Sequence, residues 1–208
     1  GHPQQYAKSS LRVLPLSDKR EQAPQVMLDQ DQTQRLIGTV VHSELERISI
    51  HKQSISDTDV QTRVKRLLRQ HGISSLNASE ASDRISQCLQ ALQSDERAQW
   101  LLWQIHPTEH SEYAITTSKD QVTRSMIIDR LIIDQNNQLW IVDYKTSQPE
   151  HGEPLSVFLD RKQAEYQHQL EQYVDAIREC YKQPIRCALY FPFIQAWHSW
   201  RPAVLETN

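Results

Sequence analysis

Glycine is scarce in this sequence of 208 residues, which contains only Gly1, Gly38, Gly72 and Gly152. No two of them have the spacing of a G-x-x-x-x-G-K-[ST] loop, whose backbone cradles nucleotide phosphates. We therefore expect no ATP site in this chain.

Cysteine and long apolar runs are also scarce. Cys88, Cys180 and Cys187 are odd in number and lack C-x-x-C spacing, which predicts reduced thiols rather than a disulfide framework. No apolar run approaches the roughly 20 residues that span a bilayer, and the first residues show no signal-peptide pattern. The net charge of -3 excludes a general attraction to nucleic acid or acidic membranes. We expect a cytoplasmic protein with no membrane partner.

The composition is otherwise ordinary for a folded domain, with 38% hydrophobic and 24% charged residues. Residues 1–28 are rich in Gln, Ser and Pro and predict an N-terminal arm that is extended or partly disordered. Residues 29–208 predict a single domain, because the length allows one good core. The chain begins with Gly1-His2 and no initiator methionine, so we expect it to be a piece of a longer protein.

Helical periodicity dominates the first half of the chain. A first helix is predicted from residue 29, with His42 beside its apolar stripe, where a lone histidine is more often packed in the core than a ligand. Further helices are predicted at 57–70, 77–93 and 95–103, which form a helical insertion at about 55–105. The second of these carries Arg63, Lys65, Arg66 and Arg69. A solvated basic face explains them more simply than phosphate contacts.

After Pro107 the hydrophobic period changes to two, which predicts strands. Strands are expected at 112–117, 121–134 and 139–145, joined as an antiparallel sheet, with Asn136-Asn137 as the turn between the last two. A long helix at 156–182 and a fourth, apolar strand at 185–191 follow, before a Trp-rich tail. The predicted order is thus helix, three strands, helix, strand.

Three charges fall on the predicted hairpin. Asp129 ends one apolar run, while Asp143 and Lys145 follow another and project from the same face, because strand side chains alternate. Buried carboxylates require a compensating cation or hydrogen bonds. Either Lys145 or a divalent metal can compensate, and a simple salt bridge at the end of a hairpin is an equally good interpretation of these residues alone.

Four sequence blocks together resemble the nuclease domain of the RecB and AddA type, within the PD-(D/E)xK phosphodiesterases. The resemblance covers about residues 36–193, in the right order. The blocks are Gly38-Thr39-x-x-His42-x-x-Leu45-Glu46, Ile128-Asp129-Arg130, Val142-Asp143-Tyr144-Lys145-Thr146 and Tyr166-x-x-Gln169-Leu170-x-x-Tyr173. The implied fold is α/β, a restriction-endonuclease-like core with a mixed sheet and an inserted helical subdomain.

The resemblance also implies a metal site. It assigns Mg²⁺ or Mn²⁺ to His42, Asp129, Asp143 and the backbone carbonyl of Tyr144, which are oxygen and imidazole ligands that suit these ions. By the same resemblance, Lys145 orients or deprotonates the attacking water and stabilises the transition state.

Other family positions are assigned with alternatives. Gln169 and Tyr173 share one helical face and either point back at the catalytic site or form a polar seam between helix and sheet. Weaker DNA contacts are expected at Arg130, Tyr166, Arg161 and Lys162. Glu112 is either an additional acidic group of the site or, as we slightly favour, a strand-edge charge.

Two departures from the family pattern concern Met126 and the cysteines. Met126 stands where relatives often have glycine, which is expected to narrow the approach to the metal. The cysteines do not match the four that hold an iron–sulfur cluster in some relatives, so we expect no such cluster.

The implied function is that of a single-strand exonuclease in double-strand break repair and recombination, in a bacterial cytosol. Its expected partners are single-stranded DNA, a UvrD-like superfamily 1 helicase motor in the same full-length chain, and a second helicase–nuclease subunit. Two alternatives remain: a catalytically silent module that binds DNA or braces a helicase, and an endonuclease of another branch, such as a junction resolvase or restriction enzyme.

Overall fold

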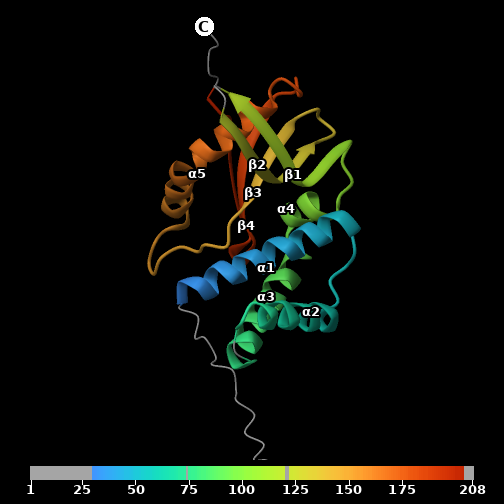
Figure 1. Ribbon diagram of the computed structural model, residues 1–208, viewed down its shortest axis with the longest axis vertical. Coiled ribbons are helices and arrows are strands. Elements are labelled where there is room, and N and C mark those ends of the chain that lie inside the picture. Colours follow the sequence, from blue (N-terminus) through green and yellow to red (C-terminus); the bar gives the residue numbers. More distant parts are fainter. Residues whose placement is uncertain (1–29, 74, 120–121, 204–208) are drawn as a thin grey trace, which may run out of the picture.

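The computed structural model describes residues 30–73, 75–119 and 122–203, which form a twisted sheet with helices on both faces (Figure 1). Helix α1 (Gln30–His51) crosses one face and helix α5 (Leu155–Ile177) lies on the other. Each helix contributes to its own hydrophobic core, which we call the α1 core and the α5 core. The predicted arm at 1–28 lies outside the described residues.

The sheet has five strands in the described part of the chain, in the order β1-β2-β3-β4-β5. They are β1 (Thr108–Lys119), β2 (Val122–Ile133), β3 (Leu139–Tyr144), β4 (Ile185–Phe191) and β5 (Ala196–Trp200). All neighbours are antiparallel except β3 and β4, which run parallel because α5 carries the chain back between them. The predicted α/β fold with a mixed sheet is confirmed.

The structure adds one strand to the predicted order. The Trp-rich tail, for which no strand was predicted, forms β5 against β4 at the edge of the sheet. Gln195 adopts the left-handed conformation (φ 46°) and turns the chain between the two strands. A five-residue segment such as β5 carries too little periodicity to predict a strand.

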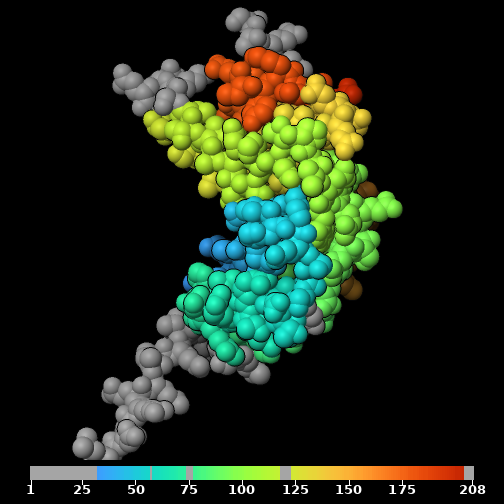
Figure 2. All heavy atoms as spheres, turned by 90° about the vertical axis from the view of Figure 1, so that its right-hand side faces the viewer, coloured from blue at the N-terminus to red at the C-terminus, as the bar shows by residue number. Residues whose placement is uncertain are grey.

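The helical insertion lies on the α1 side, beyond the end of the sheet (Figure 1). It consists of α2 (Asp57–Gln70), α3 (Ser75–Leu92), α4 (Glu96–Ala98) and the π-helix η1 (Gln99–Trp103). In the space-filling view, the β1–β2 hairpin and this insertion project on either side of α1 and leave a hollowed face (Figure 2). Within the described residues, no helix is both long and apolar enough to cross a membrane.

Strand β1 switches faces at Glu112. Residues two apart on a strand normally share a face, yet Ser111 contacts Ser49 of α1 while Tyr113 packs against the α5 core. The switch coincides with a left-handed backbone at Glu112 (φ 49°), which is uncommon for a residue with a side chain.

Strand β2 switches faces at the matching position, Asp129. Arg130 donates to a carbonyl of η1 on the α1 side, whereas Ile128 belongs to the α5 core. Regular pairing joins Ser111 to Arg130 and Tyr113 to Ile128, and it is interrupted between these two pairs. The distortion therefore sets two carboxylates, Glu112 and Asp129, side by side.

Candidate metal and active site

Three potential metal ligands meet where β1 and β2 switch faces. His42 from α1, Glu112 from β1 and Asp129 from β2 each offer a ligand atom, and these atoms lie within 4.8 Å of one another. We call these three residues the metal cluster. It joins an imidazole far upstream in the sequence to one of the two predicted acidic ligands.

Asp129 contacts both β3 and α1. Its Oδ2 accepts the backbone N–H of Tyr144 at 2.7 Å and lies 3.6 Å from Nδ1 of His42. The His42 ring meets the ring of Tyr144 edge to face, with centroids 5.8 Å apart. Contacts with β3 therefore orient both the carboxylate and the imidazole.

Burial and neighbouring charges shift the pKa values of the metal cluster in ways that suit a bound cation. Burial, followed by the negative charge of Asp143, raises the pKa of Asp129 to about 8, and the hydrogen bond from Tyr144 and the charge of Lys145 offset only part of this. Burial lowers the pKa of His42, with Asp143 acting in the opposite direction. The imidazole is then neutral near pH 7, so its contact with Asp129 is not an ion pair, and a neutral imidazole is the form that binds metals.

Glu112 lies within the metal cluster, which favours the alternative of an additional acidic group over the strand-edge charge that we had slightly preferred. Burial, followed by Glu46 and Asp143, raises the pKa of its carboxyl group. Strand alternation could not place this side chain, because the left-handed backbone at Glu112 turns it out of the regular pattern.

The side chains of Asp143 and Lys145 point toward α5, but their charges still act on His42 and Asp129 of the metal cluster. The intervening Tyr144 is in the α1 core, so its neighbours face α5. Lys145 Nζ is 2.5 Å from Asp143 Oδ2 and 4.1 Å from the ring centroid of Tyr166 on α5. The contact lies outside hydrogen-bond geometry, so the buried Asp143 Oδ2 makes no hydrogen bond within the described residues.

A family model described as "PD-(D/E)XK nuclease superfamily" matches residues 6–206 of the sequence. The chain belongs to the PD-(D/E)XK nuclease superfamily. Members of this superfamily are generally phosphodiesterases that use divalent metals, and the imidazole and two carboxylates of the metal cluster fit such an ion. The identity of the ion does not follow from these ligands, since hard oxygens suit Mg²⁺ and the imidazole equally suits Mn²⁺.

A solved structure and the curated proteins were also compared with this PD-(D/E)XK chain. A solved structure titled "Crystal structure of SSO0001" is 15% identical, with 82% of this chain and 79% of that chain covered, at a TM-score of 0.33. No curated protein matches the sequence.

Gln169 and Tyr173 of α5 are joined to each other. Gln169 Nε2 donates to the hydroxyl of Tyr173 at 2.7 Å. Burial, followed by the charge of Asp143, raises the pKa of Tyr173 to about 12, with smaller contributions from Asp129 and Glu112. The phenol of Tyr173 therefore stays protonated near neutral pH, and the charges of Asp143, Asp129 and Glu112 all favour this state.

The predicted DNA contact at Arg130 is wrong, because its side chain is buried at 1% exposure and bonded within the protein. Arg161 is exposed but forms a two-pronged pair with Glu153 at 2.9 and 2.8 Å. Lys162 is 2.7 Å from Glu165 and 5.6 Å from the Tyr166 ring centroid. Arg161 and Lys162 therefore reach a phosphate only by exchanging these partners.

A cavity of about 570 Å³ opens beside the metal cluster, between α1 and the β1–β2 hairpin. It is lined by Gln34, Arg35, Gly38, Thr39, His42, Ser43, Glu46, Glu112, Ile127, Asp129 and Thr146. Gly38 allows the close approach of α1, since a Cβ there would lie 3.3 Å from Thr146 Oγ1. Met126 packs against the α5 core and does not line this cavity, so the residue that borders the metal approach is Ile127.

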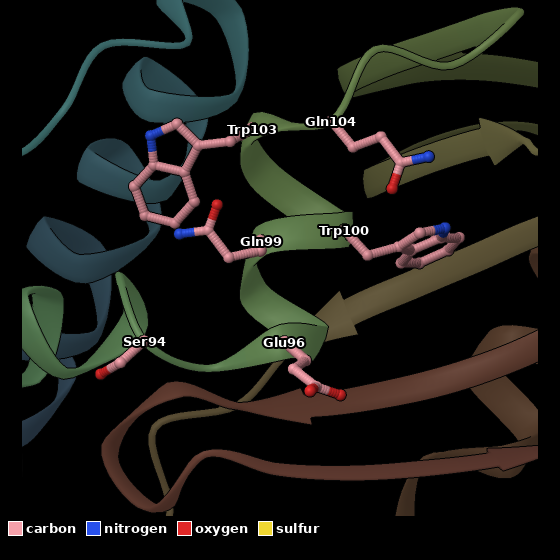
Figure 3. Close-up of a pocket in the computed structure, with 6 residues that line it drawn as sticks. All are labelled: Ser94, Glu96, Gln99, Trp100, Trp103 and Gln104. Atoms are coloured by element: carbon pink, nitrogen blue, oxygen red, sulfur yellow. The ribbon is translucent and has the colours of Figure 1, made fainter.

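A second cavity, of about 500 Å³, lies along η1 (Figure 3). Trp103 and Trp100 project to opposite sides of the helix there, with Gln99 beside Trp103. Glu96 is the one ionisable group among its lining residues. This cavity therefore offers no cluster of acids or bases comparable with the metal cluster.

Proposed function

We propose that this chain is a divalent-metal-dependent deoxyribonuclease that digests single-stranded DNA from an end. One observation carries the proposal: the face switch of β1 and β2 brings His42, Glu112 and Asp129 together beside the cavity. Asp143 and Lys145 lie close enough to act electrostatically on the same groups. This is the residue set that metal-assisted phosphodiester hydrolysis requires.

The metal would be held by His42, Asp129, Glu112, Asp143 and the backbone carbonyl of Tyr144. When bound, Mg²⁺ or Mn²⁺ supplies Lewis acidity toward the scissile phosphate and acidifies a bound water. The neutral imidazole of His42 is already in the state that binding needs. The proton that Asp129 retains near neutral pH must leave for its carboxylate to become a ligand.

Lys145 would supply a fixed positive charge at the reacting phosphate. Its ammonium group is held between the Asp143 carboxylate and the face of the Tyr166 ring. A charge fixed in advance stabilises the negative charge that develops on the phosphate without reorganising in the reaction. The protonated phenol of Tyr173 is a nearby hydrogen-bond donor that orients the substrate or the water.

The electrostatics favour a single strand that is delivered to the site. Among the residues that line the cavity, Glu46 and Glu112 are acidic and Asp129 keeps its proton near neutral pH, while Arg35 is the one cation because the imidazole of His42 is neutral. Two phosphate backbones would be repelled by this lining more strongly than one, and the net charge of -3 gives no compensating attraction. A helicase motor in the same full-length protein, with a second helicase–nuclease subunit, would deliver the strand during double-strand break repair.

Digestion of end-labelled single-stranded DNA tests the proposal directly. With Mg²⁺ or Mn²⁺ the native chain should shorten the strand, while Asp143→Ala and Lys145→Ala should leave it intact. Linear strands should be degraded and covalently closed single-stranded circles should survive. Cleaved circles would indicate an endonuclease, and DNA binding without any cleavage would indicate a silent module. Equal digestion by all three proteins would exclude this site as the source of activity.

A further inference from the structure

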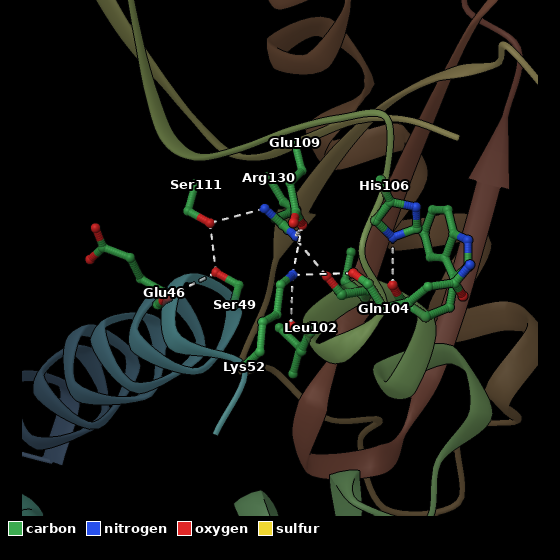
Figure 4. A network of polar contacts seen from close by, with 11 residues as sticks. Glu46, Ser49, Lys52, Leu102, Gln104, His106, Glu109, Ser111 and Arg130 are labelled. Atoms are coloured by element: carbon green, nitrogen blue, oxygen red, sulfur yellow. Dashed lines mark hydrogen bonds and ion pairs between the residues drawn. The ribbon is translucent and has the colours of Figure 1, made fainter. Parts of the chain in front are cut away.

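A buried polar network lies next to the metal cluster and shares none of its residues (Figure 4). Its centre is Arg130, which directly follows Asp129. Arg130 Nε donates to the carbonyl of Leu101 at 3.1 Å, Nη1 donates to Ser111 Oγ at 3.2 Å, and Nη2 pairs with the carboxylate of Glu109. The planar guanidinium thereby binds acceptors on η1 and at two positions of β1.

Lys52 extends the network to the end of α1. Its Nζ donates to Glu109 Oε2 at 2.7 Å and to the carbonyls of Leu102 and Gln104 at 3.1 and 3.2 Å. The last carbonyls of a helix lack intrahelical hydrogen-bond donors. In η1, Arg130 donates to the carbonyl of Leu101 and Lys52 donates to that of Leu102. Lys52 itself has a left-handed backbone (φ 54°), so the chain leaves α1 in a conformation held by these contacts.

A second link joins α1 to β1 directly. Ser49 Oγ lies 2.6 Å from Ser111 Oγ, which also accepts from Arg130. Ser49 is about two helical turns from His42 on the same helix. The network thus ties together α1, β1 and β2, which are the three elements that carry His42, Glu112 and Asp129.

We infer that Arg130 is a positioning residue for the metal: it locks the three ligand-bearing elements of the metal cluster at their working separation. The bonded residues Ser111 and Arg130 flank Glu112 and Asp129 at the point where both strands switch faces. A left-handed residue with a side chain persists only where its surroundings hold it. This inference rests on the proposed metal-dependent function.

Arginine is specifically suited to this role. Its fork donates in three fixed directions, whereas the ammonium group of lysine is a single point with flexible attachment. A lysine at position 130 would keep the charge and lose the simultaneous contacts with η1, Ser111 and Glu109. Comparing Arg130→Lys with Arg130→Met therefore separates the effect of the guanidinium's hydrogen-bond geometry from the effect of its positive charge.

Calorimetric titration with Mn²⁺ tests the inference without relying on cleavage. Removing groups that orient metal ligands typically weakens affinity about 10–100-fold, and we expect that loss for both Arg130 variants. Ser111→Ala, a milder change that is expected to fold in any case, should weaken binding severalfold. Glu44→Gln is the matched control, because it removes a buried carboxylate that Arg63 binds at 2.6 Å on the face of α1 turned away from His42. It should lower the melting temperature and leave Mn²⁺ affinity within about twofold.

The outcomes distinguish this inference from the proposed function. If the native chain binds Mn²⁺ and folded Arg130→Lys and Ser111→Ala bind it equally well, the positioning role is excluded and the metal site stands. If Glu44→Gln weakens binding as much as they do, the loss reflects general destabilisation and the positioning role is again excluded. If the native chain binds no Mn²⁺, the proposed function fails and the inference fails with it.

Discussion

The two faces of the sheet treat their buried carboxylates in opposite ways. On the α5 side, Asp143 is paired with Lys145, and the ammonium group also lies over an aromatic ring. On the α1 side, Glu112 and Asp129 lie together with a neutral imidazole, and the pKa of each carboxyl group is raised. The N–H of Tyr144 and the charge of Lys145 offset only part of this shift at Asp129. Asp143 therefore has a cation beside it in the fold, whereas Glu112 and Asp129 would gain one from the proposed metal, to which Asp143 is also a proposed ligand.

Replacing Lys145 should have a large effect on cleavage and should distinguish its role from that of the metal ligands. Lys145→Met is expected to reduce DNA cleavage by about 10²–10³-fold, the usual result of removing one preorganised electrostatic contact. Mn²⁺ affinity should stay the same or increase, because a competing positive charge is removed. Cleavage rates and calorimetry on the same protein measure both effects.

Lys182→Met is the control for this comparison, since Lys182 is exposed and bonds only the carbonyl of Arg178 among the described contacts. It should change neither quantity. If Lys145→Met loses metal binding, Lys145 does not act as a fixed charge that is separate from the metal ligands.

Asp129→Asn should abolish metal binding and make the metal-free protein more stable at alkaline pH. The folded-state pKa is about 8, against an ordinary value of 3.8. Between these values the folded chain holds a proton that the unfolded chain releases, so its unfolding free energy falls as pH rises from about 4 to about 8. Asparagine has no proton to lose. Above pH 8 the variant should therefore melt at a higher temperature than the native chain without metal.

Melting curves between pH 4 and pH 9, with and without Mn²⁺, measure this prediction. Added Mn²⁺ should raise the melting temperature of the native chain and leave that of Asp129→Asn unchanged. Because other groups also titrate in this range, the test is the difference between the two proteins: if the native chain gains stability over Asp129→Asn as pH rises from 4 to 8 without metal, the raised pKa of Asp129 is wrong.

The compensated face could be predicted from the sequence and the uncompensated one only in part. Asp143 and Lys145 follow a regular apolar strand, so alternation alone places them together. His42 stands on a strongly periodic helix, which made its position predictable once the family resemblance assigned it to the site. Regular periodicity predicted the helices and the three hairpin strands, and with the family resemblance it gave two of the three residues of the metal cluster, His42 and Asp129.

The parts that could not be predicted depend on breaks in periodicity. Glu112 joins the metal cluster because its own backbone is left-handed. The sequence does not predict this conformation, because it is uncommon for any residue other than glycine. Arg130 is buried because the end of a π-helix, about 30 residues earlier in the chain, presents a carbonyl to it. A charged residue at the edge of an active site is normally expected to face solvent.

Glu112→Gln should have an intermediate effect, which sharpens the comparison within the α1 face. The amide keeps the shape and an oxygen but loses the negative charge, so Mn²⁺ affinity should fall about tenfold, a loss of roughly 1.4 kcal/mol. The effect of Asp129→Asn should be much larger, because Asp129 is fixed by the backbone of Tyr144. Glu46→Gln is the control: it lies in the same cavity outside the metal cluster and should change the affinity less. Equal losses in the two glutamate variants would exclude Glu112 as a ligand.

Gly38→Ala should have the smallest effect and tests whether α1 must approach β3 closely. In a helix interior, alanine is favoured over glycine by roughly 0.5–1 kcal/mol, so the melting temperature should be unchanged or slightly raised. The new methyl group would lie 3.3 Å from Thr146 Oγ1, and Thr146 directly follows Lys145. Cleavage should therefore fall about two- to threefold without a loss of stability, because a shift of Thr146 also shifts the neighbouring Lys145.

The double variant Gly38→Ala/Thr146→Ala is the control. It lacks the hydroxyl group that the new methyl group would contact, so cleavage should return to the level of Thr146→Ala alone. If the double variant shows the two losses simply added, the close approach at Gly38 does not position the catalytic strand.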